Sequence, residues 1–509
     1  MTADPTRRAN RWAILPVVSV ALLLVAIDAT VLHIAVPTLT LALGPSATQL
    51  LWIIDIYPLL MAGLLLAAGT LGDRFGHKRM LLLGLVLFAL ASAACAFAPG
   101  PAWLIAGRAF LAFGGAMMMP ATLSIIRLVF DDPRERATAI GVWGAVASGG
   151  AAFGPVVGGA LLEHFSWGAV FLINIPIILV ALPFAAWLVP GRRDDRGGHP
   201  WDLPGLVMAM VGVMALVYAV KQSTHEGADL WQAAAIAVAG AALVATFLRR
   251  QARAAAPMID LSLFRNPAIA IALASAMVAM IAVVGFELLL SQQLQLVLGL
   301  SPLQAGLRLA PVPLASFLAS PFAGRLAHRF GFRVTATASL ALSAAGFAAV
   351  GLLPPGEVSA ATVVAFIAIG AGLGAAMTAA STTVMNSAPA HQAGAVASVE
   401  EVAYELGGGL GVALFGSLMT VLYQRLMALP PMLEAAVPAA RRSIGEALIS
   451  AESLAAPDSG LVAAAARGAF SVAYQGAALA AAELLAATAL AALVVLARRR
   501  AAQPGFSER

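Results

Sequence analysis

Long apolar stretches separated by short polar segments run through almost the whole chain. In a helix, about 20 apolar residues cross the roughly 30 Å hydrocarbon core of a bilayer at about 1.5 Å per residue. By this measure the sequence predicts fourteen membrane-spanning helices. Their approximate ranges are 12–36, 49–71, 79–98, 102–128, 137–162, 167–189, 203–220, 231–248, 267–298, 303–326, 334–353, 359–384, 394–422 and 470–497. The pattern predicts an all-α integral membrane protein.

The composition excludes an ordinary water-soluble fold. Hydrophobic residues make up 61% of the 509 residues and charged residues only 11%, against about 45–50% and about 25% in typical globular proteins. The single cysteine, Cys95, cannot form an internal disulfide or a thiolate metal site. The seven histidines lack ligand spacing and no Walker A loop occurs. We therefore expect no metal, no cofactor and no enzymatic activity.

The positions of the basic residues predict how the chain is oriented in the membrane. With the N-terminus inside, most of the 30 lysines and arginines fall in cytoplasmic segments, as the positive-inside rule requires. The first apolar stretch lacks a small-residue cleavage site, so we interpret it as a retained helix and not as a signal peptide. We expect both termini in the cytoplasm. We also expect the basic loops to contact membrane lipid and not nucleic acid.

One short sequence occurs twice, about half the chain apart. The first copy, at 69–79, reads Gly-Thr-Leu-Gly-Asp-Arg-Phe-Gly-His-Lys-Arg, and the second, at 324–333, reads Gly-Arg-Leu-Ala-His-Arg-Phe-Gly-Phe-Arg. Chance similarity between two glycine- and arginine-rich loops is the alternative explanation. The match in register favours two six-helix halves, 12–189 and 267–497, joined by a linker at 190–266 that contains two inserted helices.

The first copy has the residues of a closing contact between helices. Gly76 permits a tight turn, Asp73 is suited to a helix end, and Arg74 and Arg79 are available to a neighbouring helix terminus. Such a charged cluster can hold one conformation closed. Because His328 replaces Asp73 in the second copy, we expect a weaker closure on that side.

The segment that begins at Gly69 resembles motif A of the major facilitator superfamily. Residues 150–159 resemble its antiporter motif C, through Gly150, Gly154, Pro155, Gly158 and Gly159. With Asp28 in the first predicted helix and Asp55 in the second, the fourteen-helix pattern is similar to the QacA/SmvA branch of multidrug/proton antiporters. The resemblance implies the major facilitator fold and location in the inner membrane of a bacterium. It also implies export of lipophilic cations, such as quaternary ammonium antiseptics and dyes, in exchange for protons.

Two of the departures from the family pattern bear on candidate functional residues or on substrate preference. Arg108 matches the arginine of motif B, but Leu111 and Ala112 stand where glutamine and glycine usually follow. The predicted span at 303–326 has no acidic residue, although some relatives carry one there. The first departure puts in doubt the polar contact that accompanies the arginine, and the second bears on the preference for divalent cations.

Ionisable side chains at membrane depth are costly and mark functional sites by default. The acidic residues of this kind are Asp28, Asp55, Glu287, Glu400, Glu401, Glu405 and Glu483. Asp28, Asp55 and Arg108 fall at a similar depth. A neighbouring arginine favours an ionised carboxylate, whereas burial favours a protonated one. We interpret these three residues as a proton-coupling group; a permanent ion pair that only holds helices together is the alternative.

A second group of acids lies on the thirteenth predicted helix. Glu401 and Glu405 share a face, and Glu400 points about 100° away. The family resemblance places an acidic pair and a following acid at these positions. We assign Glu401 and Glu405 to proton coupling and Glu400 to substrate binding.

Further candidates for substrate binding combine one acid with aromatic side chains. Glu287 lies beside Phe286 in the ninth predicted helix; its alternative is a neutral, protonated glutamic acid that hydrogen-bonds a neighbouring helix. The remaining aromatic candidates for a pocket that takes flat organic cations are Trp52, Tyr57 and Tyr404. Core or lipid-facing positions are the alternative for each of them.

Two segments have candidate mechanical roles. Gly150, Gly154 and Gly158 let helices approach closely and Pro155 bends the helix, which favours a sealed, flexing interface over simple tight packing. The long external loop at 423–468 either forms short amphipathic helices over a cavity mouth or is passive.

The combined pattern predicts a monomeric secondary transporter. Rocking of its two halves would expose a central cavity alternately to each side of the membrane. An exporter or importer of a small metabolite on the same fold is the first alternative. Repeated halves with buried titratable groups suit coupled transport better than they suit a membrane receptor, a channel or an enzyme.

Overall fold

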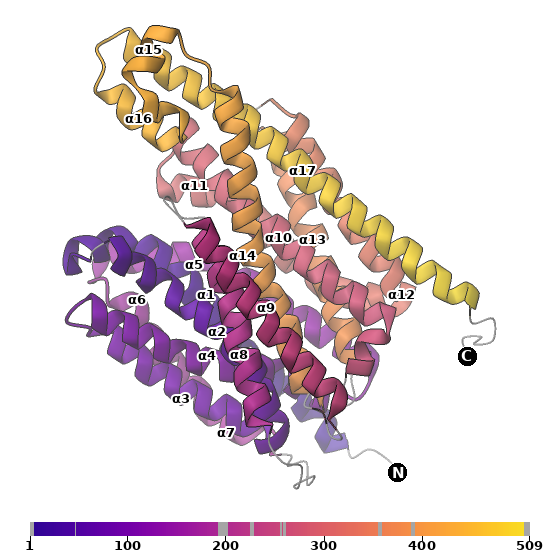
Figure 1. Ribbon diagram of the computed structural model, residues 1–509. Helices are drawn as coiled ribbons and strands as arrows, with labels where there is room; N and C mark the ends of the chain where they lie inside the picture. Colours follow the sequence, from indigo (N-terminus) through magenta and orange to yellow (C-terminus); the bar gives the residue numbers. More distant parts are fainter. Residues whose placement is uncertain are drawn as a thin grey trace.

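Helices form all of the regular secondary structure of the described residues in the computed structural model of the protein. The structure describes residues 5–45, 47–191, 202–223, 229–254, 257, 261–354, 359–387 and 392–502. Figure 1 shows a bundle in two parts, with the indigo and purple N-terminal half on one side and the orange and yellow helices of the C-terminal half on the other. The predicted all-α class is therefore confirmed.

The N-terminal half contains the first six predicted spans. Its helices are α1 (Pro5–Leu43), α2 (Ala47–Phe75), α3 (His77–Ala96), α4 (Pro101–Val129), α5 (Pro133–His164), α6 (Ala169–Leu172) and α7 (Asn174–Leu188). The last two are separated by Ile173 and together form one apolar span. The tight turn between α2 and α3 depends on Gly76, whose φ of 97° lies in the region that only glycine adopts readily.

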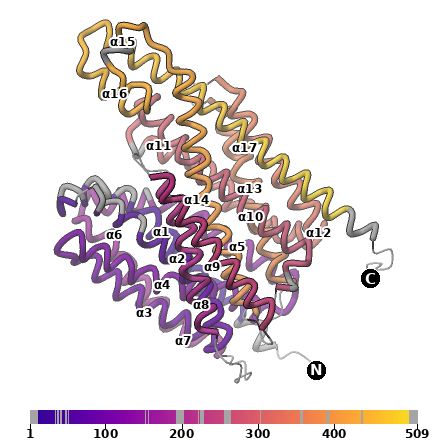
Figure 2. Tube along the Cα trace, in the orientation of Figure 1, coloured from indigo at the N-terminus to yellow at the C-terminus, as the bar shows by residue number. Residues whose placement is uncertain are grey.

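Two inserted helices, α8 (Leu203–Ser223) and α9 (Leu230–Arg253), follow the N-terminal half. They cross closely because Gly212 and Gly240 lie against each other's backbone. One face of α8 packs on Leu59 of α2 through Val213 and Val217, and the same cluster includes side chains of the C-terminal half. The inserted pair therefore covers the line along which the two halves meet, as Figure 2 shows for α8 beside α2 and α14.

The C-terminal half contains the last six spans. Its elements are η1 (Leu261–Arg265), α10 (Pro267–Gln292), the π-helical η2 (Gln293–Val297), α11 (Pro302–Leu309), α12 (Pro311–Leu352), α13 (Ala360–Ser387), α14 (Ala393–Leu426), α15 (Pro431–Ala436), η4 (Pro438–Arg441), α16 (Ile444–Glu452) and α17 (Asp458–Ala502). Helices α15 and α16 lie in the predicted external loop. Because α17 begins at Asp458, that loop is shorter than the sequence pattern indicates.

The described helices accommodate the fourteen predicted spans. Twelve described segments are long and apolar enough to cross a membrane. One of them, Gln304–Leu352, is interrupted by the non-helical Gly331 at φ 78° and carries the tenth and eleventh predicted spans. Helix α5, with 32 residues, carries the fifth.

The halves meet at the end of the bundle where α1 begins, near the label N in Figure 1, which we call the basic end. Gly69 of α2 lies against the backbone of Gly394 on α14, and Gly324 of α12 lies against that of Ala137 on α5. A Cβ atom at either glycine would overlap the facing carbonyl group. Glycine is therefore required for this closed contact.

Polar side chains also join the halves. At the basic end, the Arg136 guanidinium donates to the Asn386 amide oxygen at 2.6 Å. Burial, followed by the nearby positive charge of Arg127, lowers the pKa of Arg136 to about 10, so this arginine remains charged at neutral pH. Nearer the middle of the bundle, the hydroxyls of Ser148 and Ser316 hydrogen-bond at 2.8 Å. These contacts hold the two halves together in the described conformation.

Candidate functional site

A buried polar cluster lies inside the N-terminal half. The Asp28 carboxylate of α1 is 3.5 Å from the Arg108 guanidinium of α4. The Asn174 amide of α7 donates to Asp28 at 3.4 Å and to the Ser92 hydroxyl of α3 at 3.1 Å. Each of these four residues is at most 1% exposed. Four helices therefore converge on one carboxylate that has no direct access to solvent in this conformation.

The cluster is sparsely hydrogen-bonded for its burial. Arg108 Nε and Nη1, the Asn174 Oδ1 atom and the Tyr57 hydroxyl are buried without a hydrogen-bond partner. Tyr57 lies beside Arg108, with the guanidinium carbon 5.2 Å from its ring centroid. Unsatisfied donors and acceptors in an apolar interior are costly and are retained mainly at functional sites. The arrangement leaves Asp28 with weak contacts that a proton or a conformational change can replace.

The third predicted member of this group, Asp55, is on α2, but its side chain lies outside the described residues. Asn174 was not assigned a role from the sequence. The available signal was an asparagine at the start of a strongly apolar helix, where a polar side chain needs a partner.

The acids of α14 face different neighbours. The Glu400 carboxylate accepts hydrogen bonds from the Tyr404 hydroxyl at 2.6 Å and from the Ser381 hydroxyl of α13 at 3.2 Å. Glu401 is also buried, at 3% exposure, and its Oε1 atom has no hydrogen-bond partner. Glu405 is half-buried. Glu400 is therefore held within the C-terminal half.

Glu401 and Glu405 lie near the face of α14 that meets the other half. That face is marked by Ser398, which lies next to Gly69 of α2. Residues three and seven positions after Ser398 fall within about 60° of it on a helix. Two carboxyl groups are thus placed along the seam between the halves, and Tyr404 and Glu400 lie directly behind them.

The two groups of acids occupy different depths. Asp28 is about 25 Å along α1 from Arg11, whereas Glu400 is only about 10 Å from the start of α14 at the basic end. The structure therefore does not bring Asp28 and Glu400 together. Tyr57 lies beside Arg108 and is close enough to Asp28 and Glu405 for their charges to act on its hydroxyl.

The substrate candidates are distributed over several surfaces. Glu287 is exposed on α10. Ala276 lies on the same face of α10, about three turns nearer the basic end, and is buried in the core of the N-terminal half. Glu287 thus faces the inter-half side about 16 Å farther out. Phe286 instead packs against Phe347 and Tyr474 within the C-terminal half.

Trp52 of α2 is the most accessible of the aromatic candidates. It is 37% exposed and stacks on Tyr218 of the inserted helix α8, with ring centroids 6.2 Å apart. The inserted pair thus supplies an aromatic ring beside one predicted substrate residue.

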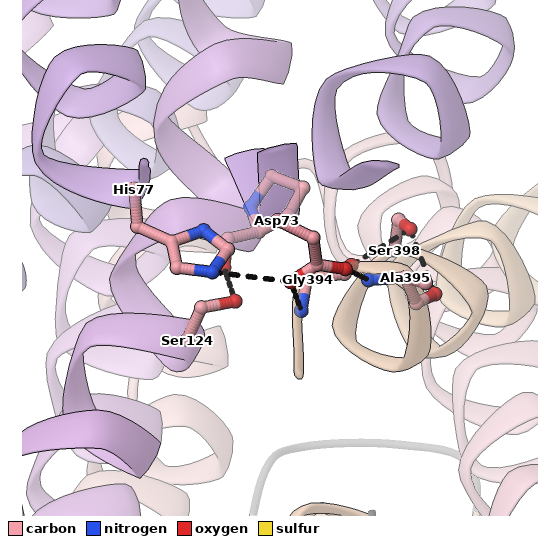
Figure 3. Close-up of polar contacts among 7 residues, drawn as sticks. Asp73, His77, Ser124, Gly394, Ala395 and Ser398 are labelled. Atoms are coloured by element: carbon pink, nitrogen blue, oxygen red, sulfur yellow. Dashed lines mark hydrogen bonds and ion pairs between the residues drawn. The ribbon is translucent and has the colours of Figure 1, made fainter. Parts of the chain in front are cut away.

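The first copy of the repeated turn reaches across to the other half. The Asp73 carboxylate accepts hydrogen bonds from the backbone N–H groups of Gly394 and Ala395, both at 2.9 Å, at the start of α14 (Figure 3). His77 lies 3.2 Å from the same carboxylate. Arg74 stacks over Phe75, and Arg79 is exposed. Asp73 therefore accepts hydrogen bonds from the free N–H groups at the start of a helix that belongs to the opposite half.

Motif C packs on α1. Gly150 lies against Ala26, Gly154 against the Thr30 side chain and Gly158 against Val31, whereas Gly159 has open space around its Cα. The side chain of Pro155 lies outside the described residues. Since Asp28 lies between Ala26 and Thr30, these glycines set how closely α5 approaches the segment that carries it.

Gly154→Leu should therefore destabilise the N-terminal half. The added side chain would overlap Thr30, and overpacking of this kind costs about 1–3 kcal/mol. We expect a lower midpoint in thermal unfolding of the purified protein, and slower transport. Gly159→Leu is the matched control and should leave the midpoint unchanged; equal midpoints for the two variants would contradict the tight contact.

A cavity of about 500 Å³ opens at the end opposite the basic end, between α10 and α14. Its lining includes Gln292, Tyr423 and Phe470 from helices and Arg442 from the external loop. The Tyr423 hydroxyl donates to the backbone carbonyl of Ala440 at 2.9 Å, which anchors the loop to α14. The external loop therefore forms part of a cavity wall.

Comparisons with known proteins agree with this architecture. The family model of the Major Facilitator Superfamily matches residues 18–412. The methyl viologen resistance protein SmvA of Salmonella typhimurium is 45% identical over 446 residues, covering 87% of this chain and 90% of that protein. The multidrug efflux pump LfrA of Mycolicibacterium smegmatis is 41% identical over 500 residues, covering 98% of each. The crystal structure of the human organic anion transporter MFSD10 has a TM-score of 0.64 at 15% identity, covering 95% of this chain and all of that one.

Proposed function

This chain belongs to the major facilitator superfamily, and from that membership we propose that it exports lipophilic organic cations in exchange for protons. It is a multi-pass membrane transporter and not an enzyme. Two of its relatives are named for methyl viologen resistance and for multidrug efflux. Methyl viologen is a flat dication, which is the chemistry that carboxylates and aromatic rings recognise. Quaternary ammonium antiseptics and planar dyes belong to the same class.

The observation that carries the proposal is the position of Glu401 and Glu405 at the seam between two halves of a rocking transporter. When the halves separate at the basic end, the burial of these carboxyl groups changes, and burial controls whether a carboxyl group holds a proton. A substrate cation and a proton then compete for the same negative charge. That competition is the first element of the proposed proton coupling.

Asp28 and Arg108 form the second element of the proposed coupling, with Asp55 on the neighbouring helix. The long contacts around Asp28 allow a change in the packing of α1 against α5 to alter its protonation. Tyr57 would transmit the change, since the charges of both Asp28 and Glu405 act on it. Glu287, Glu400, Trp52, Phe286 and Tyr404 are the proposed substrate-binding residues.

The basic residues support an orientation with the basic end in the cytoplasm and both termini inside, in the inner membrane of a bacterium. In this orientation the described conformation is closed toward the cytoplasm. Asp73 would stabilise that state, and release of its contacts would admit the next substrate from the cytoplasmic side. The chain would work as a monomer because both halves are within it.

The decisive experiment is cation flux in proteoliposomes that contain the purified protein. The proteoliposomes are loaded with ethidium or a quaternary ammonium compound, and a pH gradient is imposed across their membrane. We expect the cation to move in exchange for protons. The fluorescence of a fluorescent cation reports the cation movement, and a pH-sensitive dye reports the proton movement. Absence of cation flux would favour the alternative of a metabolite transporter on the same fold. Flux that ignores the gradient would reject proton coupling.

Glu287→Gln should reduce transport of a dication more than that of a monocation. Removing one negative charge weakens the attraction for a nearby cationic charge by about 1 kcal/mol or more, and a second cationic charge on the substrate increases the loss. We expect methyl viologen transport to fall about tenfold and ethidium transport to fall less. Glu483→Gln, at an exposed acid on α17, is the control. Equal losses for the two substrates would remove Glu287 from charge recognition.

A further inference from the structure

A basic cavity lies at the basic end, where α1 and α5 of the N-terminal half meet α12 of the C-terminal half. Its volume is about 660 Å³. Its lining includes Trp12 of α1, Arg134 and Glu135 of α5, and Arg325, His328 and Arg329 of α12. The cavity thus joins the N-terminal half to the C-terminal half at the level of the second repeated turn.

The cavity carries an excess of positive charge. Its single acid, Glu135, is already paired with Arg11 at 2.7 Å. None of Arg134, Arg325 and Arg329 forms an ion pair with an acid among the residues that the structure describes. Three guanidinium groups around one cavity repel one another unless an anion lies between them.

The repeat explains why the second turn contributes no anion to this side. In the first copy, the Asp73 carboxylate crosses the seam and binds the start of α14. In the second copy, His328 occupies the corresponding position. The second repeated turn therefore supplies no carboxylate to its side of the seam, where the acid of the cavity, Glu135, is already paired with Arg11.

An apolar stripe runs beside the cationic groups. Phe322, Leu326 and Phe330 are 60%, 44% and 52% exposed and follow one another at four-residue intervals on α12. Trp12, 40% exposed, lines the same cavity. Tryptophan at this level is typical of the membrane–water interface. An amphipathic ligand here would place its polar headgroup against the guanidinium groups and its apolar part along the stripe.

We propose that this cavity binds the headgroup of an anionic phospholipid from the surrounding leaflet. Its phosphate lies between Arg134 on one half and Arg325 and Arg329 on the other, and its acyl chains lie along the stripe on α12. Basic pockets between helices on the cytoplasmic side are suited to such headgroups. The lipid replaces the carboxylate that the second repeat lacks and stabilises the closed basic end.

The first test is lipid retention by the purified full-length protein, measured by native mass spectrometry after addition of phosphatidylglycerol or phosphatidylcholine. We expect selective retention of phosphatidylglycerol. Combined Arg325→Gln and Arg329→Gln should weaken it roughly 25-fold, at about fivefold for each arginine. Combined Arg249→Gln and Arg253→Gln, at exposed arginines of α9 near the same end, is the charge-matched control and should retain the lipid. Equal retention by both double variants, or equal loss in both, would overturn the proposal.

Two further measurements keep the test decisive. Arg325→Lys with Arg329→Lys preserves the charge and should restore most of the retention, which separates a binding defect from a folding defect. Inorganic phosphate should fail to displace phosphatidylglycerol; displacement by phosphate alone would show a site for a free anion and reject the lipid. No substrate or pH gradient is used, so the result is independent of the proposed drug export.

Discussion

Asp73→Ala should open the basic end and reduce drug export by more than tenfold. The Asp73 carboxylate, with 14% of its side chain exposed, accepts two backbone hydrogen bonds across the seam. Hydrogen bonds to charged groups contribute about 1.5–3 kcal/mol each, and the negative charge also complements the N-terminal end of α14. A loss of about 3 kcal/mol would shift the population of the closed state by about a hundredfold.

The shift can be measured by labelling a cysteine that only opening exposes. Ala397 of α14 is fully buried where the halves meet, so Ala397→Cys in a Cys95→Ala background should react slowly with a maleimide. Addition of Asp73→Ala should accelerate labelling strongly, and Asp73→Asn, which keeps one carbonyl acceptor, should have a smaller effect.

His328→Ala is the matched control for the Asp73 variant because it changes the corresponding residue of the second repeat. His328 is exposed and is not part of the backbone contacts that Asp73 makes. Its replacement should leave the labelling rate near that of the parent protein. Equal rates for the Asp73 and His328 variants would show that the Asp73 contacts do not hold the closed state.

The sequence predicted the helices well because membrane spans have a length imposed by the bilayer. Apolar runs of about 20 residues have one stable arrangement in lipid, in which every backbone group is satisfied within the helix. The residue types of the first repeated segment also predicted Gly76 in a turn and Asp73 near a helix end. It could not identify the partner of Asp73, since the start of α14 is more than 300 residues away and only the packing of the halves brings it close.

The polar contacts of the candidate site were predictable only in part. Spacing along one helix separates Glu400 from Glu401, and the structure places Glu400 against Ser381. Contacts between helices depend on rotation about each helix axis, which the sequence leaves open. For this reason the sequence selected Asp28 and Arg108 but gave Asn174 no role, although its amide lies 3.4 Å from Asp28.

Arg108→Leu should be the most destabilising single change in the N-terminal half. Removing one partner of a buried ion pair leaves the other charge uncompensated, at a cost of about 3–5 kcal/mol. For a chain of this length that cost lowers the melting temperature by about 3–5 degrees. Arg249→Leu, at an exposed arginine, should have no such effect. A melting temperature that is equally low in the control would point to loss of charge in general and not to the buried pair.

Adding Asp28→Asn to Arg108→Leu separates stability from proton coupling. The double variant has no unpaired buried charge, so it should recover most of the lost melting temperature, as replacement of buried ion pairs by neutral groups often does. It should still fail to release protons when substrate is added to proteoliposomes, since asparagine cannot carry the exchanged proton. A permanent structural ion pair predicts the opposite outcome, in which the rescued protein releases protons normally. The comparison therefore tests directly whether Asp28 carries a proton or only holds the helices together.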